Sequence, residues 1–283
     1  MSTIYDTIRT NFQDSILRVT GEDYLFYLYE NHHWDITGVN ELVEKIIAVH
    51  GSDEEVDHRA LRDYLKQLDQ TANENVMDQN QSLLGFSNGV YDLRTRTFRD
   101  GERADMISCP IGYDYHPYDP ESGEVQAVWE YLRSVFPEEG RAESLVRTLA
   151  SHLFGTVPPE LLIFYGTGAN GKTVLAKLLS DAVGSYLRYI DPISSSAILH
   201  RILPGARFTR MAELDTNHPI VASALERVYQ MGCTPIVDCY NAEYIPADVP
   251  HQLIEFKQTF ATACKYQPPC TPAALCAVLI HHA

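Results

Sequence analysis

One stretch, residues 161–184, constrains what this chain can fold into more than any other. It opens with an apolar run at 161–165 and continues as Gly-Thr-Gly-Ala-Asn-Gly-Lys-Thr at 166–173. Apolar residues at helical spacing follow, and Gly184 has the type and place of a helix cap. A strand, a glycine-rich turn and a helix in this order predict a loop that binds phosphate.

The residue types in the turn match that chemistry. Glycines let the backbone N–H groups approach phosphate oxygens, and the start of a helix presents unpaired N–H donors to the anion. We expect Lys172 to reach the β- and γ-phosphates and the Thr173 hydroxyl to bind Mg²⁺. The alternative, a turn that binds nothing, is disfavoured because the full motif and both flanks are present. The predicted nucleotide-binding residues are Gly166, Thr167, Gly168, Ala169, Asn170, Gly171, Lys172, Thr173 and Val174.

A second strand-like run covers Phe208 to Ala212 and leads directly into Glu213. A carboxylate at the end of a strand downstream of a phosphate loop can hold the Mg²⁺ shell or polarise the attacking water. The other interpretation of Glu213 is an exposed acid at a strand end. With the phosphate loop upstream, the sequence favours the catalytic role.

Length and charge narrow the function further. The chain has 283 residues, enough for two domains. Its net charge of −16 disfavours general binding to a nucleic-acid backbone and restricts any such contact to local loops. We find neither a secretory signal at the amino terminus nor an apolar run of membrane-spanning length, so we expect a cytoplasmic protein without a membrane partner.

The six cysteines form no C-x-x-C pair. Cys264, Cys270 and Cys276 are evenly spaced and precede two histidines, but this spacing fits no standard zinc module. We therefore expect free buried thiols in a reducing compartment.

In chain order, residues from about 4 to 70 read as helical, with apolar faces at 24–28, 42–49 and 61–68 and with Trp34 in the core. A β-rich patch follows at 83–98, where Asn88-Gly89 is a strong turn signal. Residues 117–123 form the best candidate linker.

Beyond the linker, two helices are expected at 125–136 and 145–154, before the strand of the phosphate loop. Another helix is expected at 225–231. We interpret 232–236 as a loop and 254–264 as a strand that contains Lys257.

The order of these pieces resembles the superfamily 3 helicases, in particular the helicase part of primase-helicases from large DNA viruses, phages and plasmids. Four segments carry the resemblance: Asn-Gly-Val-Tyr-Asp-Leu at 88–93, the Asn-Gly-Lys form of the phosphate loop, Gly-Ala-Arg-Phe at 205–208 leading to Glu213, and Gly232 with Pro235-Ile236. The similarity spans most of residues 20–269.

The resemblance implies an α/β fold: a P-loop NTPase (AAA+-like) parallel sheet core at 121–283, preceded by a smaller, mainly helical α+β domain at 1–120. It implies a DNA helicase that uses ATP and Mg²⁺, forms a hexameric ring, and moves 3′ to 5′ along single-stranded DNA. A primase domain or protein is an expected partner. Catalysis would fall to Lys172 and Glu213, with Thr173 and Glu213 at the metal. DNA contacts would fall to Lys257, Tyr240 and Tyr244, for which the alternative is a solvated lysine and two partly buried tyrosines.

The chain departs from the family pattern at several places. Cys233 and Thr234 stand where the family has Gly and Asp, an expected Arg after Ile236 is missing, and no Asn ends the strand near Cys264. The sequence also stops before the expected arginine finger, which is expected of a fragment, of a degenerate copy, or of one subunit completed by another polypeptide. These departures keep a second hypothesis open, an ATP-binding ring or assembly module with weak catalysis. A small-molecule P-loop kinase is disfavoured, because no basic lid follows the loop.

Overall fold

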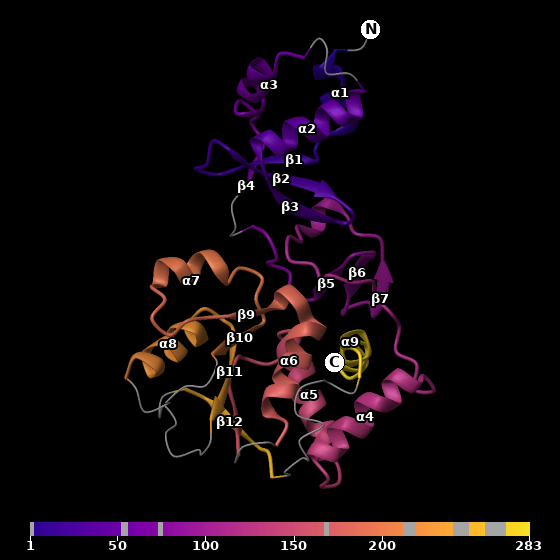
Figure 1. Ribbon diagram of the computed structural model, residues 1–283, viewed down its shortest axis with the longest axis vertical. Helices are drawn as coiled ribbons and strands as arrows, with labels where there is room; N and C mark the ends of the chain where they lie inside the picture. Colours follow the sequence, from indigo (N-terminus) through magenta and orange to yellow (C-terminus); the bar gives the residue numbers. More distant parts are fainter. Residues whose placement is uncertain are drawn as a thin grey trace.

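The computed structural model describes residues 3–51, 56–72, 76–166, 170–211, 219–239, 249–257 and 270–283. Three β-sheets organise the chain (Figure 1). A four-stranded sheet lies in the amino-terminal unit, a small three-stranded sheet follows it, and a five-stranded sheet forms the centre of the second half. The amino-terminal unit lies at one end of the long axis and the five-stranded sheet toward the other.

The amino-terminal unit combines helices with a mixed sheet. In chain order its elements are α1 (Ile4–Asn11), β1 (Ile16–Val19), β2 (Leu25–Glu30), β3 (His33–Gly38), α2 (Val39–His50), α3 (His58–Leu65) and β4 (Thr71–Ala72). The strand order is β3-β2-β1-β4, with β4 parallel to β1 and the other pairs antiparallel. Helices α2 and α3 confirm two of the expected apolar faces, and Gly51 ends α2 in the left-handed conformation.

The expectation that residues 4–70 are helical throughout was wrong between Ile16 and Gly38. Residues 24–28, expected as a helical face, lie mostly in β2, which forms a hairpin with β3. Asn31 and His32 make its turn, with φ of 46° and 72°. Asn and His are among the residues that enter this region most easily, and an aromatic run suits a pleated strand. Trp34 is 2% exposed, so its placement in the core is confirmed.

The small sheet matches the expected β-rich patch. It consists of β5 (Leu83–Phe86), β6 (Gly89–Asp92) and β7 (Thr97–Arg99), all antiparallel, and a short 3-10 helix, η1 (Arg103–Asp105), follows. Gly89 is required at the turn, because its φ is 151° and a Cβ there would lie 2.5 Å from the Arg99 carbonyl oxygen.

The small sheet packs against the second half of the chain. Leu84, Phe86 and Ile111 share one core with helices that follow residue 120, and the Gly85 N–H donates to the Tyr186 hydroxyl at 2.9 Å. The division of the chain at residue 120 stays a prediction. Packing alone groups the small sheet with the second half.

The second half is built on a parallel sheet. Its elements are α4 (Gly123–Val135), α5 (Arg141–Leu153), β8 (Leu161–Tyr165), α6 (Lys172–Val183), η2 (Gly184–Tyr186), β9 (Leu187–Tyr189), α7 (Ser196–Ile202), β10 (Phe208–Met211), α8 (Pro219–Gln230), β11 (Thr234–Cys239), β12 (His251–Glu255) and α9 (Pro272–His281). The strand order is β12-β8-β11-β10-β9, and every neighbouring pair is parallel. The expected parallel sheet is confirmed, as are the helices at α4 and α5.

Strand β8 shows how the layers form. Leu162 and Phe164 face the core shared with α4, α5, α6 and α9, whereas Leu161 and Ile163 face the core shared with α7 and α8. Successive side chains of a strand point to opposite faces, so a strand covered on both sides must be apolar throughout. This explains the unbroken apolar run at residues 161–165.

Two expectations in the second half were wrong. The segment predicted as a loop at 232–236 contains the start of β11, the strand between β8 and β10. Pro235 lies at the second position of β11, one residue before the pairing of β11 with β8 begins at Ile236, so its missing N–H falls outside that ladder. The strand expected at 254–264 is β12, which begins at His251 and ends at Glu255, before Lys257. Residues 258–269 lie outside the described part of the chain.

The residues after 269 form a buried helix. Nearly every side chain of α9 from Ala274 to Ile280 is excluded from solvent, and the helix packs against α6, α4 and α5 (Figure 1). A helix that is apolar on all sides fits only in such a covered position. None of the helices in the described part of the chain is both long and apolar enough to cross a bilayer.

A buried histidine near the start of the parallel sheet yields a testable pH dependence. His152 is 4% exposed, with Nε2 3.1 Å from Glu160 Oε1 and Nδ1 3.0 Å from Thr234 Oγ1. Burial lowers the pKa of His152 below its ordinary value of 6.5. The unfolded chain therefore takes up a proton before the folded chain does, and the free energy of unfolding falls as the pH drops below about 6.5.

The check is denaturant unfolding between pH 7.5 and 5.5 for the wild-type chain and for His152→Gln. The variant should lose less stability over this range than the wild type. Identical pH slopes for the two proteins would contradict the assignment.

Candidate nucleotide-binding site

The predicted phosphate loop lies at the carboxyl end of β8. Described residues of the loop are Gly166, Asn170 and Gly171, and α6 begins at Lys172. Residues 167–169, which were also predicted to bind nucleotide, lie outside the described residues. The next strand in the chain, β9, is at one edge of the sheet and β12 is at the other, so the strand order reverses beside β8. Ligands of open α/β sheets bind outside the carboxyl ends of the strands at such a switch point.

Glycine is needed where the chain leaves β8. A Cβ at Gly166 would lie 2.4 Å from the Phe256 carbonyl oxygen and 2.5 Å from Asn170 Nδ2, and the φ of Gly166 is 144°. Gly171, the residue before α6, has a φ of 92°. Gly166 and Gly171 therefore have backbone conformations that residues with a side chain rarely adopt, and at Gly166 the Phe256 carbonyl oxygen occupies the space that a Cβ would need.

Lys172 folds back over this loop. Its Nζ donates to the Gly166 carbonyl oxygen at 2.5 Å and to Asn170 Oδ1 at 3.0 Å, while Asn170 Nδ2 donates to the Phe256 carbonyl oxygen at 3.0 Å. The residue is 9% exposed. Burial lowers the pKa of Lys172, and the Asp238 carboxylate opposes this shift. An ammonium held in this position can donate charge-assisted hydrogen bonds to phosphate oxygens.

The two residues after Lys172 differ in exposure. Thr173 is exposed on the first turn of α6, whereas Val174 is buried in the core beneath the helix. The Thr173 hydroxyl is thus available to a metal ion, and Val174 fixes the helix to the sheet. The Tyr131 hydroxyl of α4 donates to the Gly171 carbonyl oxygen at 3.4 Å, which supports the loop from its other side.

A buried ion pair beneath the loop was missed by sequence reasoning. Arg210 Nη2 of β10 donates to Asp238 Oδ2 of β11 at 2.6 Å, and both side chains are 7% exposed. By strand alternation, Arg210 shares a face with Phe208 and Asp238 shares one with Ile236, which is the face covered by α6. Asp238 Oδ1 and Arg210 Nε have no hydrogen-bond partner in the described part of the chain. Charged residues inside two apolar runs were the available signal.

Glu213 itself lies outside the described residues, as do Tyr240 and Tyr244. The strand that leads to Glu213 is confirmed as β10, which ends at Met211, paired with Val237 of β11. Because β10, β11 and β8 are parallel, the chain leaves β10 at the carboxyl end of the strands, where the loop also lies. The role of Glu213 stays a prediction.

Lys257, one of the predicted DNA contacts, follows β12 at the carboxyl end of the parallel strands. Its Nζ lies 3.1 Å from Glu138 Oε1 and 3.6 Å from Glu255 Oε2, and the side chain is 56% exposed. The two carboxylates raise the pKa of Lys257. The amine is therefore charged and solvent-accessible, but carboxylates already compete for it.

No cluster of three metal-ligating His, Cys, Asp or Glu side chains occurs within the described ranges. The cysteines there are free and buried: Cys109, Cys233, Cys239, Cys270 and Cys276. Burial raises the pKa of several of them, to about 12 for Cys276. They are unreactive core residues at neutral pH.

Comparison with known proteins identifies a family and several viral relatives that match part of the chain. Residues 6–137 match the protein family described as "D5 N terminal like". A protein of Acanthamoeba polyphaga mimivirus named "Putative helicase" is 34% identical over 116 residues, which are 41% of this chain and 12% of that protein. The protein named "Putative helicase 184R" of Invertebrate iridescent virus 6 is 34% identical over 155 residues, 50% of this chain and 16% of that protein. The protein named "Primase D5" of Fowlpox virus is 30% identical over 106 residues, 35% and 13% of the two lengths.

A solved structure extends the similarity of fold. The C-terminal region of NrS-1 in its apo form matches with a TM-score of 0.58, covering 98% of this chain and 68% of that one, at 12% sequence identity. At this identity the match shows a shared fold alone. The aligned parts span less than a fifth of each of the three viral relatives described above.

Proposed function

We propose that the chain is the motor part of an ATP-dependent DNA helicase. The similarity to D5-like proteins of large DNA viruses supports this proposal and agrees with the resemblance read from the sequence. The chain would act in the replication of a virus, phage or plasmid. The observation that carries the proposal is the Lys172 ammonium, buried against the carbonyl oxygens of a loop where Gly166 leaves no room for a side chain.

The residues of the loop fit a nucleoside triphosphate. Gly166 and Gly171 give the chain beside β8 and α6 a backbone conformation that disfavours side chains, and the first turn of α6 presents the positive end of the helix dipole beside the Lys172 cation. Thr173 would hold Mg²⁺ with a carboxylate, for which Glu213 is the candidate. A bound Mg²⁺ neutralises phosphate charge and polarises the transferred phosphoryl group.

The remaining roles follow from the same proposal. Glu213 would orient and activate the attacking water, and Lys257, Tyr240 and Tyr244 would contact single-stranded DNA. The chain would work as a P-loop NTPase of the AAA+ type in a hexameric ring, moving 3′ to 5′, with a primase domain or protein as partner. The parallel sheet with its switch point beside β8 supports this architecture.

ATP hydrolysis by the full chain, measured with and without single-stranded DNA, tests the proposal. We expect DNA to stimulate turnover. Glu213→Gln should lower turnover by about 10²-fold or more while ATP binding persists, because the amide cannot act as a base but keeps the size of the side chain. Tight ATP binding with no turnover in the wild type would instead favour the assembly module. Phosphate transfer to a small acceptor, insensitive to DNA, would favour a kinase.

A further inference from the structure

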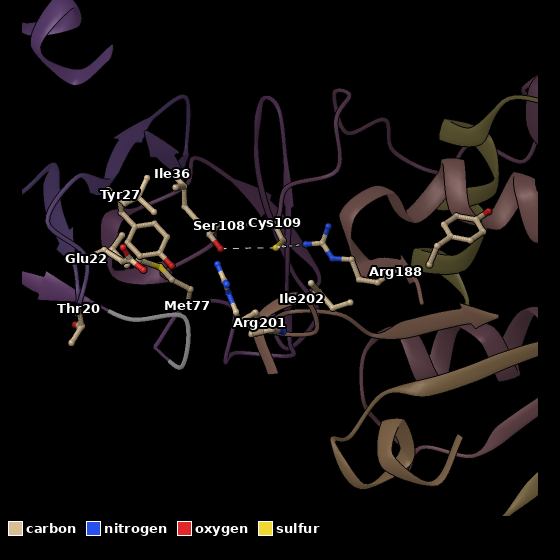
Figure 2. A pocket seen from close by; sticks show the side chains of 14 residues that line it. Thr20, Glu22, Tyr27, Ile36, Met77, Ser108, Cys109, Arg188, Arg201 and Ile202 are labelled. Carbon is tan, nitrogen blue, oxygen red and sulfur yellow. Dashed lines mark hydrogen bonds between the residues drawn. The ribbon is translucent and has the colours of Figure 1, made fainter. Parts of the chain in front are cut away.

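A cavity lies between the two halves of the chain, and no described residue of the phosphate loop lines it. It has a volume of about 830 Å³, and Figure 2 shows the side chains that line it. One wall comes from β1, β2, β3 and Met77, and the opposite wall from β9 and α7, with Ser108 and Cys109 also lining the cavity. This volume is within the range of cavities that bind small organic ligands.

Two guanidinium groups reach into this cleft. Arg188 of β9 and Arg201 of α7 both point toward Ser108 and Cys109 (Figure 2). Arg188 Nη2 donates to Cys109 Sγ at 3.0 Å, but its Nε is buried without a hydrogen-bond partner in the described part of the chain. Arg201 is exposed and forms no ion pair with any described residue.

These donors lack a matching anion. A thiol sulfur is a weak acceptor, and Asp78 directs its carboxylate to the Ser108 hydroxyl and the Ser108 and Cys109 N–H groups. Glu22 is the carboxylate that lines the cleft. Among the described residues that line the cleft, two arginines face the single carboxylate Glu22, whereas the chain as a whole has a net charge of −16. The guanidinium fork suits the oxygens of a phosphate better than any other common anion except a carboxylate.

Apolar surface flanks the arginines. Tyr189 is 54% exposed on the parallel-sheet wall, and Ile36 is 61% exposed on the wall opposite. Exposed aromatic and aliphatic groups beside a guanidinium provide a surface on which a planar base can stack, whichever base it is. The cleft thus presents both parts that a nucleotide needs, a phosphate site and a base site.

We propose that this cleft binds a nucleotide unit, with its phosphate between Arg188 and Arg201 and its base against Tyr189 or Ile36. The same unit can come from a free nucleotide or from a single strand of nucleic acid. The site is separate from the loop at Lys172, so it does not depend on the function proposed for that loop.

Fluorescence anisotropy on the full chain tests the site with two probes, a labelled oligodeoxythymidylate and a fluorescent ATP analogue. The chain carries Lys172→Ala so that the phosphate loop contributes less to either signal. Arg201→Glu should weaken binding of at least one probe about tenfold or more, the scale of a lost charge-assisted hydrogen bond. The control is Arg59→Glu, the same change of charge on the exposed surface of α3, which should shift affinity by less than about threefold.

Glu22→Gln gives a prediction of opposite sign. Removal of the Glu22 charge should tighten binding of the probe that Arg201→Glu weakens. Arg201→Glu should also reduce the salt dependence of oligonucleotide binding by about one phosphate contact. Thermal unfolding verifies that both variants fold, as expected for exposed positions.

Each result decides between the alternatives. Loss for the oligonucleotide alone assigns the cleft to a nucleic-acid strand, loss for the ATP analogue alone assigns it to a free nucleotide, and loss for both supports the shared chemistry. Equal binding by Arg201→Glu and Arg59→Glu, or no binding of either probe in the Lys172→Ala background, overturns the proposal.

Discussion

Lys172→Ala is expected to reduce ATP turnover by about 10²–10³-fold or more, the scale found when one preorganised donor to developing charge is removed. The physical reason lies in the position of the ammonium. It is held 2.5 Å from the Gly166 carbonyl oxygen inside the loop, so its charge is already placed where a phosphate would bind. Turnover measured at saturating ATP, with ATP binding measured separately, gives both the chemical and the binding effect.

The same helix offers a matched control for this experiment. Lys177 of α6 is exposed and pairs with Asp181 at 2.7 Å on the outer side of the helix. Lys177→Ala removes an equal charge from the same element and should leave turnover unchanged. Lys172→Ala should not destabilise the fold, because it removes a buried cation whose pKa is lowered by desolvation. Turnover at the wild-type rate in Lys172→Ala would refute the assignment of the loop.

Local patterns in the sequence predicted the local structure around the loop. The change from an apolar run to a glycine turn and then to helical spacing gave β8, the loop and α6, and Gly51 and Asn88-Gly89 marked a helix end and a hairpin. In these places one short segment contains both the signal and the structure it determines. Propensity, turn chemistry and periodicity agree there.

The failures have a physical cause in common. In the segment of β2 and β3, the spacing of apolar residues favours a helix, whereas Asn31 and His32 favour a turn because both enter the left-handed region easily. Strand β11 was hidden by Pro235, because whether a proline is tolerated depends on the position within the strand. In each case tertiary context decided between local alternatives of similar strength.

The ion pair and the cleft are non-local. Arg210 and Asp238 become neighbours only when β10 and β11 lie side by side, and the cleft exists only when the amino-terminal sheet approaches β9 and α7. Strand order cannot be read from residue periodicity, so the sequence offered no route to either feature. The signal that the sequence did contain was the presence of charged residues within otherwise apolar strands.

The Arg210–Asp238 pair should have a large effect on stability. Asp238→Leu leaves the Arg210 guanidinium buried without its counter-charge, and we expect the free energy of unfolding to fall by about 3–5 kcal/mol. Removing both charges should cost much less, because the desolvation penalty of each ion disappears with the pair. The double variant Arg210→Met, Asp238→Leu should therefore be close to the wild type, or at least far more stable than Asp238→Leu alone.

Denaturant unfolding of the wild type, both single variants and the double variant gives this comparison as a double-mutant cycle. A coupling energy near zero, with the two single losses simply adding in the double variant, would contradict the pair as an isolated buried unit. The cycle also separates structure from function. Asp238 opposes the burial shift at Lys172, so its loss should lower the pKa of Lys172 further and reduce the share of charged ammonium in the loop. ATP turnover in the stable double variant should then fall most at high pH, because a neutral Lys172 amine cannot form an ion pair with phosphate.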